Sequence, residues 1–208
     1  MTQKERIIEQ AMHMFVAQGI KSVRMDDIAQ QLGVSKRTLY EQFGDKEGLL
    51  YQAMVCYFEH NRLQWATLSA GARNVLERMF MVLGNVMDHS DVTSRMMDNL
   101  KKFYPAVYDK LVREGTEKNR QEFRSMLTEG IEQGLFVDSI HIDLAITVLY
   151  YTASALVTRK DLILPEGISE REAFVQIVSN FFRGISTAKG LELIDDYLKR
   201  YEPGKERQ

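Results

Sequence analysis

Four side chains that can pair with DNA lie within five residues of one another near the N-terminus. They are Lys36, Arg37, Thr38 and Tyr40. An arginine can donate to O6 and N7 of guanine, a lysine can make a similar contact, and a threonine can reach a base or a thymine methyl group. A tyrosine hydroxyl suits a phosphate oxygen. These residue types at this spacing favour recognition of double-stranded DNA.

These side chains can act together only if a helix presents them, and the flanking residues predict that helix. Ser35 is a favourable N-cap for a helix that runs over 36–43. Leu39 and Phe43 are spaced i, i+4 and should face inward. The four candidate DNA contacts are then largely free to face outward.

A second short helix is predicted directly before this one, over 25–32. Ile28 and Leu32 lie one turn apart on its inner face, and Ala29 is small enough for another helix to cross closely. Gly33 ends the helix. Two short helices joined by a glycine turn are typical of a helix-turn-helix, whose second helix enters the major groove with its N-terminus first.

The net charge of this region does not by itself favour DNA binding, so the positions of the charged residues matter more than their number. Positive and negative residues are equal in number over 1–50, and the whole chain has a formal net charge of −2. Asp26 and Asp27 lie in the first turn of the 25–32 helix, where the helix dipole favours them, and we expect them to lie away from the recognition surface. Lys46 follows Asp45 at the start of the next helix, where backbone N–H groups favour a phosphate.

The N-terminal segment resembles the TetR family of regulators. The resemblance covers about the first quarter of the chain. It implies an all-α protein in which a three-helix helix-turn-helix DNA-binding domain over 1–48 is joined to a larger helical ligand-binding and dimerisation domain over 49–208. The strings that carry it are Met25-Asp26-Asp27-Ile28-Ala29, Leu32-Gly33-Val34-Ser35, Thr38-Leu39-Tyr40-Glu41-Gln42-Phe43 and Lys46-Glu47-Gly48-Leu49-Leu50.

The resemblance also implies roles for individual residues. Lys36, Arg37 and Thr38 would read bases, while Tyr40 and Lys46 would hold phosphates. Arg24 is a departure, because the family often has Ser or Thr at this position, where it caps the helix and touches a phosphate. Arg24 cannot cap in that way, but it could reach a phosphate or the adjacent minor groove. The complete set of expected DNA-binding residues is Arg24, Ser35, Lys36, Arg37, Thr38, Tyr40 and Lys46.

The function implied by the resemblance is that of a dimeric repressor. Such a protein is released from a pseudo-palindromic operator by a small molecule. Its two DNA-binding domains, one from each copy of the chain and called heads below, would enter successive major grooves roughly 34–36 Å apart. The expected partners are therefore double-stranded DNA, a small-molecule effector and a second copy of the chain.

The remainder of the chain reads as a series of amphipathic helices. Helices are expected from Lys46 to about Leu68, from Gly71 through Met87, and over 93–103, 105–134, 143–157, 170–187 and 191–201. The 143–157 stretch is apolar almost all round, so a helix there must be covered on more than one side. It resembles, with the 170–187 helix, the pair that forms a dimeric four-helix bundle in the family. An ordinary intramolecular core is the alternative for the expected interface residues, which are Val148, Tyr151, Phe174, Ile177, Val178, Phe181 and Phe182.

The middle helices are rich in methionine and aromatic residues. Methionine lines adaptable apolar sites, and pockets between helices are mostly apolar with few polar anchors. An apolar or aromatic ligand is the resulting expectation, although the same residues at helical spacing also suit a plain core. The candidate pocket residues are Trp65, Met96, Tyr104, Tyr108, Phe123, Met126 and Tyr150.

Other classes of protein find less support. The single cysteine, Cys56, excludes an internal disulfide. The charged N-terminus is unlike a signal peptide, and no apolar run approaches the ~18 residues of a membrane span, so a cytoplasmic protein is expected. The four histidines are scattered without metal-ligand spacing, no glycine-rich phosphate loop occurs, and neither enzymatic activity nor a metal or cofactor is expected. The alternatives are an architectural DNA-binding protein without an effector, and a helical enzyme with an incidental head.

Overall fold

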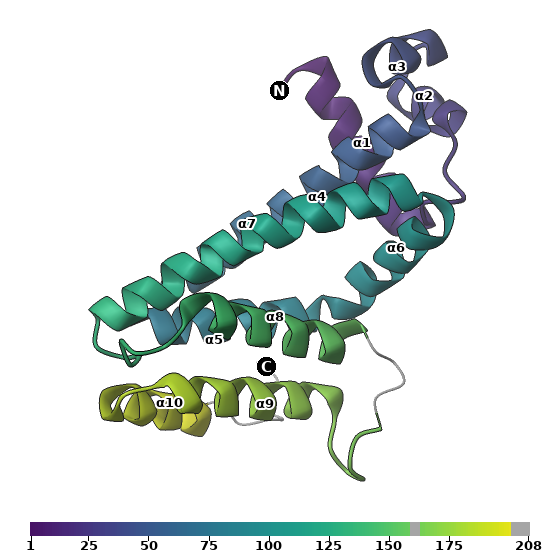
Figure 1. The fold of residues 1–208 in the computed structure, drawn as a ribbon. Helices are drawn as coiled ribbons and strands as arrows, with labels where there is room; N and C mark the ends of the chain where they lie inside the picture. The colour runs from purple at the N-terminus through teal and green to yellow at the C-terminus, as the bar shows by residue number, and fades with distance from the viewer. Residues whose placement is uncertain (159–162, 201–208) are drawn as a thin grey trace. The chain divides into compact units, whose positions relative to one another are not determined.

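The computed structural model describes residues 1–158 and 163–200, and these residues form an all-α protein (Figure 1). Within them the only extended pairing recorded is an isolated bridge between Phe136 and Ser186. None of the described helices has the length and hydropathy needed to cross a membrane. The helices are α1 (Gln3–Gln18), α2 (Met25–Leu32), α3 (Lys36–Phe43), α4 (Lys46–Ser69), α5 (Val75–Asp88), α6 (Ser90–Phe103), α7 (Pro105–Glu132), α8 (Ile142–Thr158), α9 (Glu170–Ile185) and α10 (Ala188–Arg200).

The chain divides into two compact units. The first contains residues 1–64 and 91–117, and the second contains 65–90 and the residues from 118 onward. Helices α4 and α7 each run from one unit into the other. A compact unit need not be a domain that folds alone, so the expected domain boundary between residues 48 and 49 stays a prediction.

Local capping signals explain where the first helices begin and end. The Thr2 hydroxyl accepts from the Glu5 backbone N–H at 3.2 Å, and the Thr2 backbone N–H donates to the Glu5 carboxylate at 2.7 Å. This reciprocal capping box fixes the start of α1. Gly33 ends α2 in the left-handed region with φ 65° and ψ 30°, a conformation that residues with a Cβ rarely adopt.

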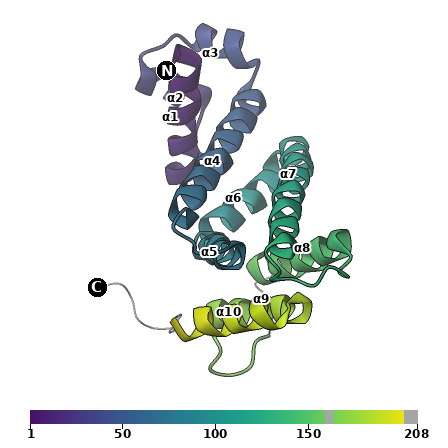
Figure 2. The same ribbon diagram turned by 90° about the vertical axis from the view of Figure 1, so that its left-hand side faces the viewer.

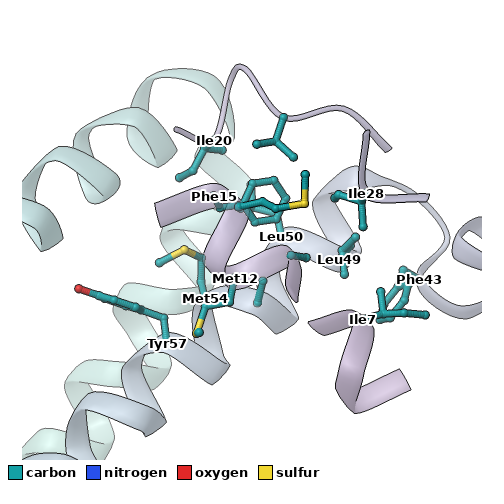
Figure 3. Packing of buried hydrophobic residues seen from close by; sticks show 14 of the residues in the cluster. Ile7, Met12, Phe15, Ile20, Ile28, Phe43, Leu49, Leu50, Met54 and Tyr57 are labelled. Atoms are coloured by element: carbon teal, nitrogen blue, oxygen red, sulfur yellow. The ribbon is translucent and has the colours of Figure 1, made fainter. Parts of the chain in front are cut away.

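The first unit packs its four N-terminal helices around one core, shown in Figure 3. Phe15 of α1, Ile28 of α2 and Leu39 of α3 are all at most 1% exposed. Leu49 and Leu50, at the start of α4, are fully buried beside them. This core holds α2 and α3 in a fixed relation to each other, as a helix-turn-helix requires.

The second unit packs α5, α8, α9 and α10 around a core rich in aromatic rings. Helix α9 contacts α8, α10 and α5, and Figure 2 shows α9 and α10 side by side. The Phe80 ring stacks on Tyr197 with centroids 4.7 Å apart and meets Phe182 edge-on at 5.3 Å. Offset-stacked and edge-to-face rings of this kind add to the stability that burial provides.

Three helices begin three or four residues away from the expected position, and one of them is α6, which begins at Ser90 rather than at residue 93. Helix α5 begins at Val75 rather than near Gly71, because the Asn74 side chain caps it by accepting from the Glu77 N–H at 2.9 Å. Helix α10 begins at Ala188 and contains Gly190, which the sequence suggested as a break. A Cβ on Gly190 would overlap the carbonyl oxygen of Leu135, so this glycine permits close packing. The predicted end of this helix at Tyr201 lies outside the described residues.

Candidate nucleic-acid interface

The turn between α2 and α3 sets the direction of the candidate recognition helix. The Val34 N–H donates to the Ala29 carbonyl at 3.1 Å. Ser35 then caps α3, because its Oγ accepts from the Thr38 N–H at 3.0 Å and also lies 2.8 Å from the Thr38 hydroxyl. The predicted N-cap is therefore confirmed, and the cap also orients the side chain of Thr38.

The outer face of α3 carries the side chains that the sequence singled out. Leu39 and Phe43 are buried in the core of the first unit, as expected. Lys36, Arg37 and Tyr40 are exposed, and Thr38 is half-buried. The side chain of Arg37 is 86% exposed. The N-terminal half of α3 thus presents donors of hydrogen bonds to solvent, with no described helix covering them.

The expectation for Asp26 is wrong. Its carboxylate lies 2.7 Å from the Lys36 ammonium, so Asp26 lies beside the recognition helix and not away from it. The hydrogen bond and the negative charge of Asp26 raise the pKa of the Lys36 ammonium. The spacing of residues along one helix cannot reveal this pair, because it depends on how closely α2 and α3 cross.

A second carboxylate engages the neighbouring cation. The Arg37 Nε donates to the Glu41 carboxylate at 2.7 Å. The i, i+4 spacing of these residues on one helix is the sequence signal that could have predicted the pair. Both candidate base-reading cations of α3 are therefore paired in the protein without DNA.

Lys46 has a partner inside the first unit. Its Nζ donates to the Ile20 carbonyl at 2.7 Å. The same ammonium lies 5.9 Å from the ring centroid of Phe15 and 5.4 Å from that of Tyr104, within the range of cation–π attraction. Lys46 thus ties together three segments of this unit, and its proposed contact with a phosphate stays a prediction.

Arg24 precedes α2 without capping it through its side chain. Instead its backbone N–H donates to the Asp27 carboxylate at 2.8 Å, so Asp27 supplies the half of the capping box that does not need Ser or Thr. The Arg24 side chain itself is exposed. Its reach to a phosphate or to the minor groove stays a prediction.

The expected pocket residues are divided between the two units. Met96, Tyr104 and Tyr108 belong to the first unit, where Met96 is buried in the core and the two tyrosines pack against it. The expectation that all seven candidates line one pocket stays a prediction. The second unit holds the other four, all half-buried: Trp65, Phe123, Met126 and Tyr150.

A small hollow does occur in the second unit, between α5, α9 and α10. Its volume is about 20 Å³, which is room for a single water molecule and too little for an effector. None of the expected pocket residues lines it; the residues that do are Phe80, Leu83, Gly84, Phe174, Val175, Val178 and Tyr197.

The expected dimer interface is only partly at the surface. Phe174, Val178 and Phe182 are at most 2% exposed and belong to the core of the second unit, so their assignment to an interface is corrected. They alternate on α9 with Ile177, which is exposed, and Phe181, which is half-buried. The apolar face of α9 is wide because it serves this core, which the sequence left open as the alternative.

Helix α8 presents an apolar stripe to solvent. Leu144, Val148 and Tyr151 are 59%, 45% and 69% exposed, and their i, i+4, i+7 spacing places them on one face. Ala145, Ile146 and Leu149 on the other side are buried. The expectation that α8 is covered on more than one side is therefore not met within the chain. Leu144 was missed as a candidate, although it lies one turn before Val148.

The described residues contain no candidate metal site. Among residues 1–158 and 163–200, no three His, Cys, Asp or Glu side chains are close enough together to hold a metal ion. The candidate site is thus a surface of hydrogen-bond donors on a short capped helix.

Comparison with known proteins gives an independent assessment of this surface. Residues 7–53 match the family described as bacterial regulatory proteins, tetR family. The match runs from α1 into α4 and includes all of α2 and α3. It therefore covers the helix-turn-helix and the start of the helix that follows.

Relatives of known function are transcriptional regulators. The repressor KstR2 of Mycobacterium tuberculosis is 21% identical over 147 residues, which cover 69% of this chain and 74% of that protein. IcaR of Staphylococcus aureus, the negative regulator of the biofilm operon icaADBC, is 32% identical over 57 residues, or 27% of this chain and 31% of that protein.

Solved structures share the fold of the chain over most of its length. The ketosteroid regulator KstR2 has a TM-score of 0.55 at 18% identity, covering 89% of this chain and 96% of its own. A transcriptional regulator from Saccharomonospora viridis, solved in complex with choline, has a TM-score of 0.65 at 20% identity, covering 88% and 97%. The chain therefore shares its fold with these solved structures.

Proposed function

Because this chain is a TetR-family transcriptional regulator, we propose that it is a dimeric repressor that reads a pseudo-palindromic operator through α3. A small apolar or aromatic molecule releases it from the DNA, and it works in the cytoplasm. The single observation that carries the DNA-binding part is the Ser35-capped helix with Lys36, Arg37, Thr38 and Tyr40 on its outer half. Arginine and lysine at the start of a helix are suited to reading guanine in the major groove.

The exposed stripe on α8 supports the dimer. Contiguous exposed apolar patches mark interaction sites on soluble proteins. A second copy would cover Leu144, Val148 and Tyr151 and place two heads on one DNA duplex. Two heads also suit a head with few cations, because linked binding events raise the overall affinity without new contacts.

Two observations support a small-molecule effector. A relative with the same fold is named as a ketosteroid regulator, and another was solved with choline bound. In this chain, the half-buried Phe123 and Met126 lie on α7 beside the core of the second unit. Flexible methionine and aromatic side chains can reshape around an apolar molecule.

The DNA-binding proposal is tested on the region upstream of the chain's own gene. The double variant R37A/Y40F removes one base-reading candidate and one phosphate contact from exposed positions, so it should fold. We expect its dissociation constant for this DNA, measured by fluorescence anisotropy, to rise by about 10- to 100-fold, since one good base contact contributes about 1–3 kcal/mol.

The control for this test is R113A, which removes an arginine from the exposed side of α7 and leaves α3 intact. It should bind the DNA as tightly as the parent. If a folded R37A/Y40F protein also binds with the parent's affinity, α3 is not the recognition helix.

A DNA-organising protein without an effector is the second candidate function. The observation in its favour is the small volume of the hollow between α5, α9 and α10, about 20 Å³, while the larger depression along α7, about 410 Å³, is open and lined by polar side chains. Mapping of bound sites across the genome separates the two functions. A repressor occupies a few operators, whereas an organising protein is bound throughout the chromosome.

A further inference from the structure

An ion pair links the two helices of the helix-turn-helix at the candidate DNA surface. Asp26 is the second residue of α2 and Lys36 is the first residue of α3, and their carboxylate and ammonium are 2.7 Å apart. The side chains are 62% and 56% exposed. A pair so open to water adds little to the stability of a protein, so its effect should be sought in binding.

We infer that Asp26 is a specificity-determining residue of the DNA interface, and that it acts by holding the ammonium of Lys36. This inference rests on the proposed function, because it assumes that α3 reads DNA. It follows from geometry: of the two cations at the start of α3, Lys36 is the one tied to the other helix. Arg37 pairs within α3 itself, with Glu41.

In the complex with an operator, the pair positions Lys36. A lysine side chain has several rotatable bonds and loses conformational entropy when it is fixed. Asp26 favours one orientation of this side chain before the DNA arrives, so less entropy is lost in the complex. The carboxylate can also accept from the N4 amino group of a cytosine next to the base that Lys36 contacts. Both effects favour one base sequence over others.

On unrelated DNA, the same pair reduces affinity. Non-specific binding depends on cations that replace the counterions of phosphates. Asp26 cancels the charge of Lys36, so one cation fewer is available for phosphates. With Asn at this position, Lys36 would gain one phosphate contact, which at 0.1 M salt corresponds to roughly five- to tenfold tighter non-specific binding. Asp26 therefore raises the ratio of specific to non-specific affinity in two ways: it strengthens binding to the operator and weakens binding to unrelated DNA.

The variant D26N tests this inference in the full-length protein. Its affinities for the upstream duplex and for an unrelated duplex are measured between 50 and 200 mM salt. The control D98N removes the same charge from an exposed position on α6. A second pair of proteins, K36Q and D26N/K36Q, shows whether Asp26 acts through Lys36.

We expect D26N to bind unrelated DNA five- to tenfold more tightly at 0.1 M salt, with a logarithmic salt dependence steeper by about one. The ratio of upstream to unrelated affinity should fall, while D98N behaves like the parent. The D26N substitution should have no such effect in the K36Q background, which a purely structural role of Asp26 would not explain.

Two outcomes would overturn the inference. One is a D26N protein with the same salt dependence and the same affinity ratio as D98N. The other is an equal effect of D26N with and without Lys36. Failure of the proposed function gives a different result, namely a parent protein that does not prefer its upstream DNA over the unrelated duplex.

Discussion

Glu77 is a buried carboxylate of the second unit that keeps its charge. Burial alone would raise its pKa, but the Arg73 N–H and the Arg200 guanidinium each donate to it at 2.9 Å. These contacts outweigh the burial and hold the pKa of Glu77 below its usual range. The ionised carboxylate joins the start of α5 to the end of α10.

The stability of the protein should therefore depend on the charge of Glu77. A carboxylate with a lowered pKa in the folded state stabilises the protein above the pKa of the unfolded chain, about 4.3, and this contribution is lost as the pH falls through the folded-state value. At pH 7 we expect E77Q to lower the free energy of unfolding by about 1–2 kcal/mol. Urea unfolding at pH 7 and near pH 3.5 should show this difference shrinking with acid.

The matched control is E192Q, on the exposed side of α10. It should leave the unfolding free energy within about 0.5 kcal/mol of the parent at both pH values. A difference between E77Q and the parent that stays constant from neutral to acid pH would show that the charge of Glu77 is not what stabilises the fold.

For the residues of α3, the sequence predicts which side chains face outward but not which partner Lys36 contacts. Ser35 as a cap and Leu39 as a buried residue follow from local spacing, and the structure has both. The contact of Lys36 with Asp26 depends on the crossing of two helices. A pattern within one helix carries no information on that distance.

At the scale of elements, the turn between α3 and α4 depends on Gly48. The Asp45 carboxylate caps α4 by accepting from the Gly48 N–H at 2.8 Å. A Cβ on Gly48 would overlap the backbone carbonyl oxygen of Phe43. Backbone atoms cannot move aside as the end of a side chain can, so a larger residue here would shift α3 against α4.

The variant G48A should consequently destabilise the first unit and misplace the recognition helix. We expect a loss of about 1–3 kcal/mol in unfolding free energy and weaker binding of the upstream DNA. Thermal and urea unfolding measure the loss of stability.

The control for this prediction is G115A, in which the new Cβ meets nothing within 4 Å. The same substitution in a helix interior should be neutral or stabilising by up to about 1 kcal/mol. Equal stability of G48A and G115A would rule out the steric argument.

Most helices were predictable because their signals are local. The Ser35 cap, the glycine turn at Gly33 and apolar residues at helical spacing mark α2, α3, α4 and α9 within a residue or two of their observed bounds. One misjudged position is Gly190, where the glycine makes room for the Leu135 carbonyl. Such an approach between distant segments cannot be read from the sequence around the glycine.

At the scale of the whole molecule, the buried and exposed faces of α8 and α9 carry different roles. The sequence assigned one set of apolar residues to an interface. The structure assigns Phe174, Val178 and Phe182 to the core and leaves Val148 and Tyr151 exposed. Hydrophobicity alone cannot separate a core face from a docking face, because both are apolar.

The exposed stripe gives a prediction about assembly. The variant V148D places a charge in the stripe at a position that is already open to water, so the chain should fold. We expect it to be monomeric by light scattering at concentrations where the parent is a dimer. Its affinity for the upstream DNA should fall by about 100-fold or more, because one head binds without the other.

The control L68D introduces the same charge at an exposed leucine of α4, which is 55% exposed. It should remain dimeric. A V148D protein that stays dimeric, or one that is monomeric and still binds DNA at full strength, would contradict the proposal that the α8 stripe joins two heads.

Selection of bound sequences from random duplexes tests the central proposal, that α3 reads bases as part of a dimer, most directly. The parent should enrich pseudo-palindromic sites whose half-sites lie about one helical turn apart, roughly 10–10.5 base pairs from centre to centre. The variant K36A should relax the preference at one position in each half-site and keep the spacing. Enrichment of no common sequence by the parent, or of the same sequence by K36A at every position, would contradict this account.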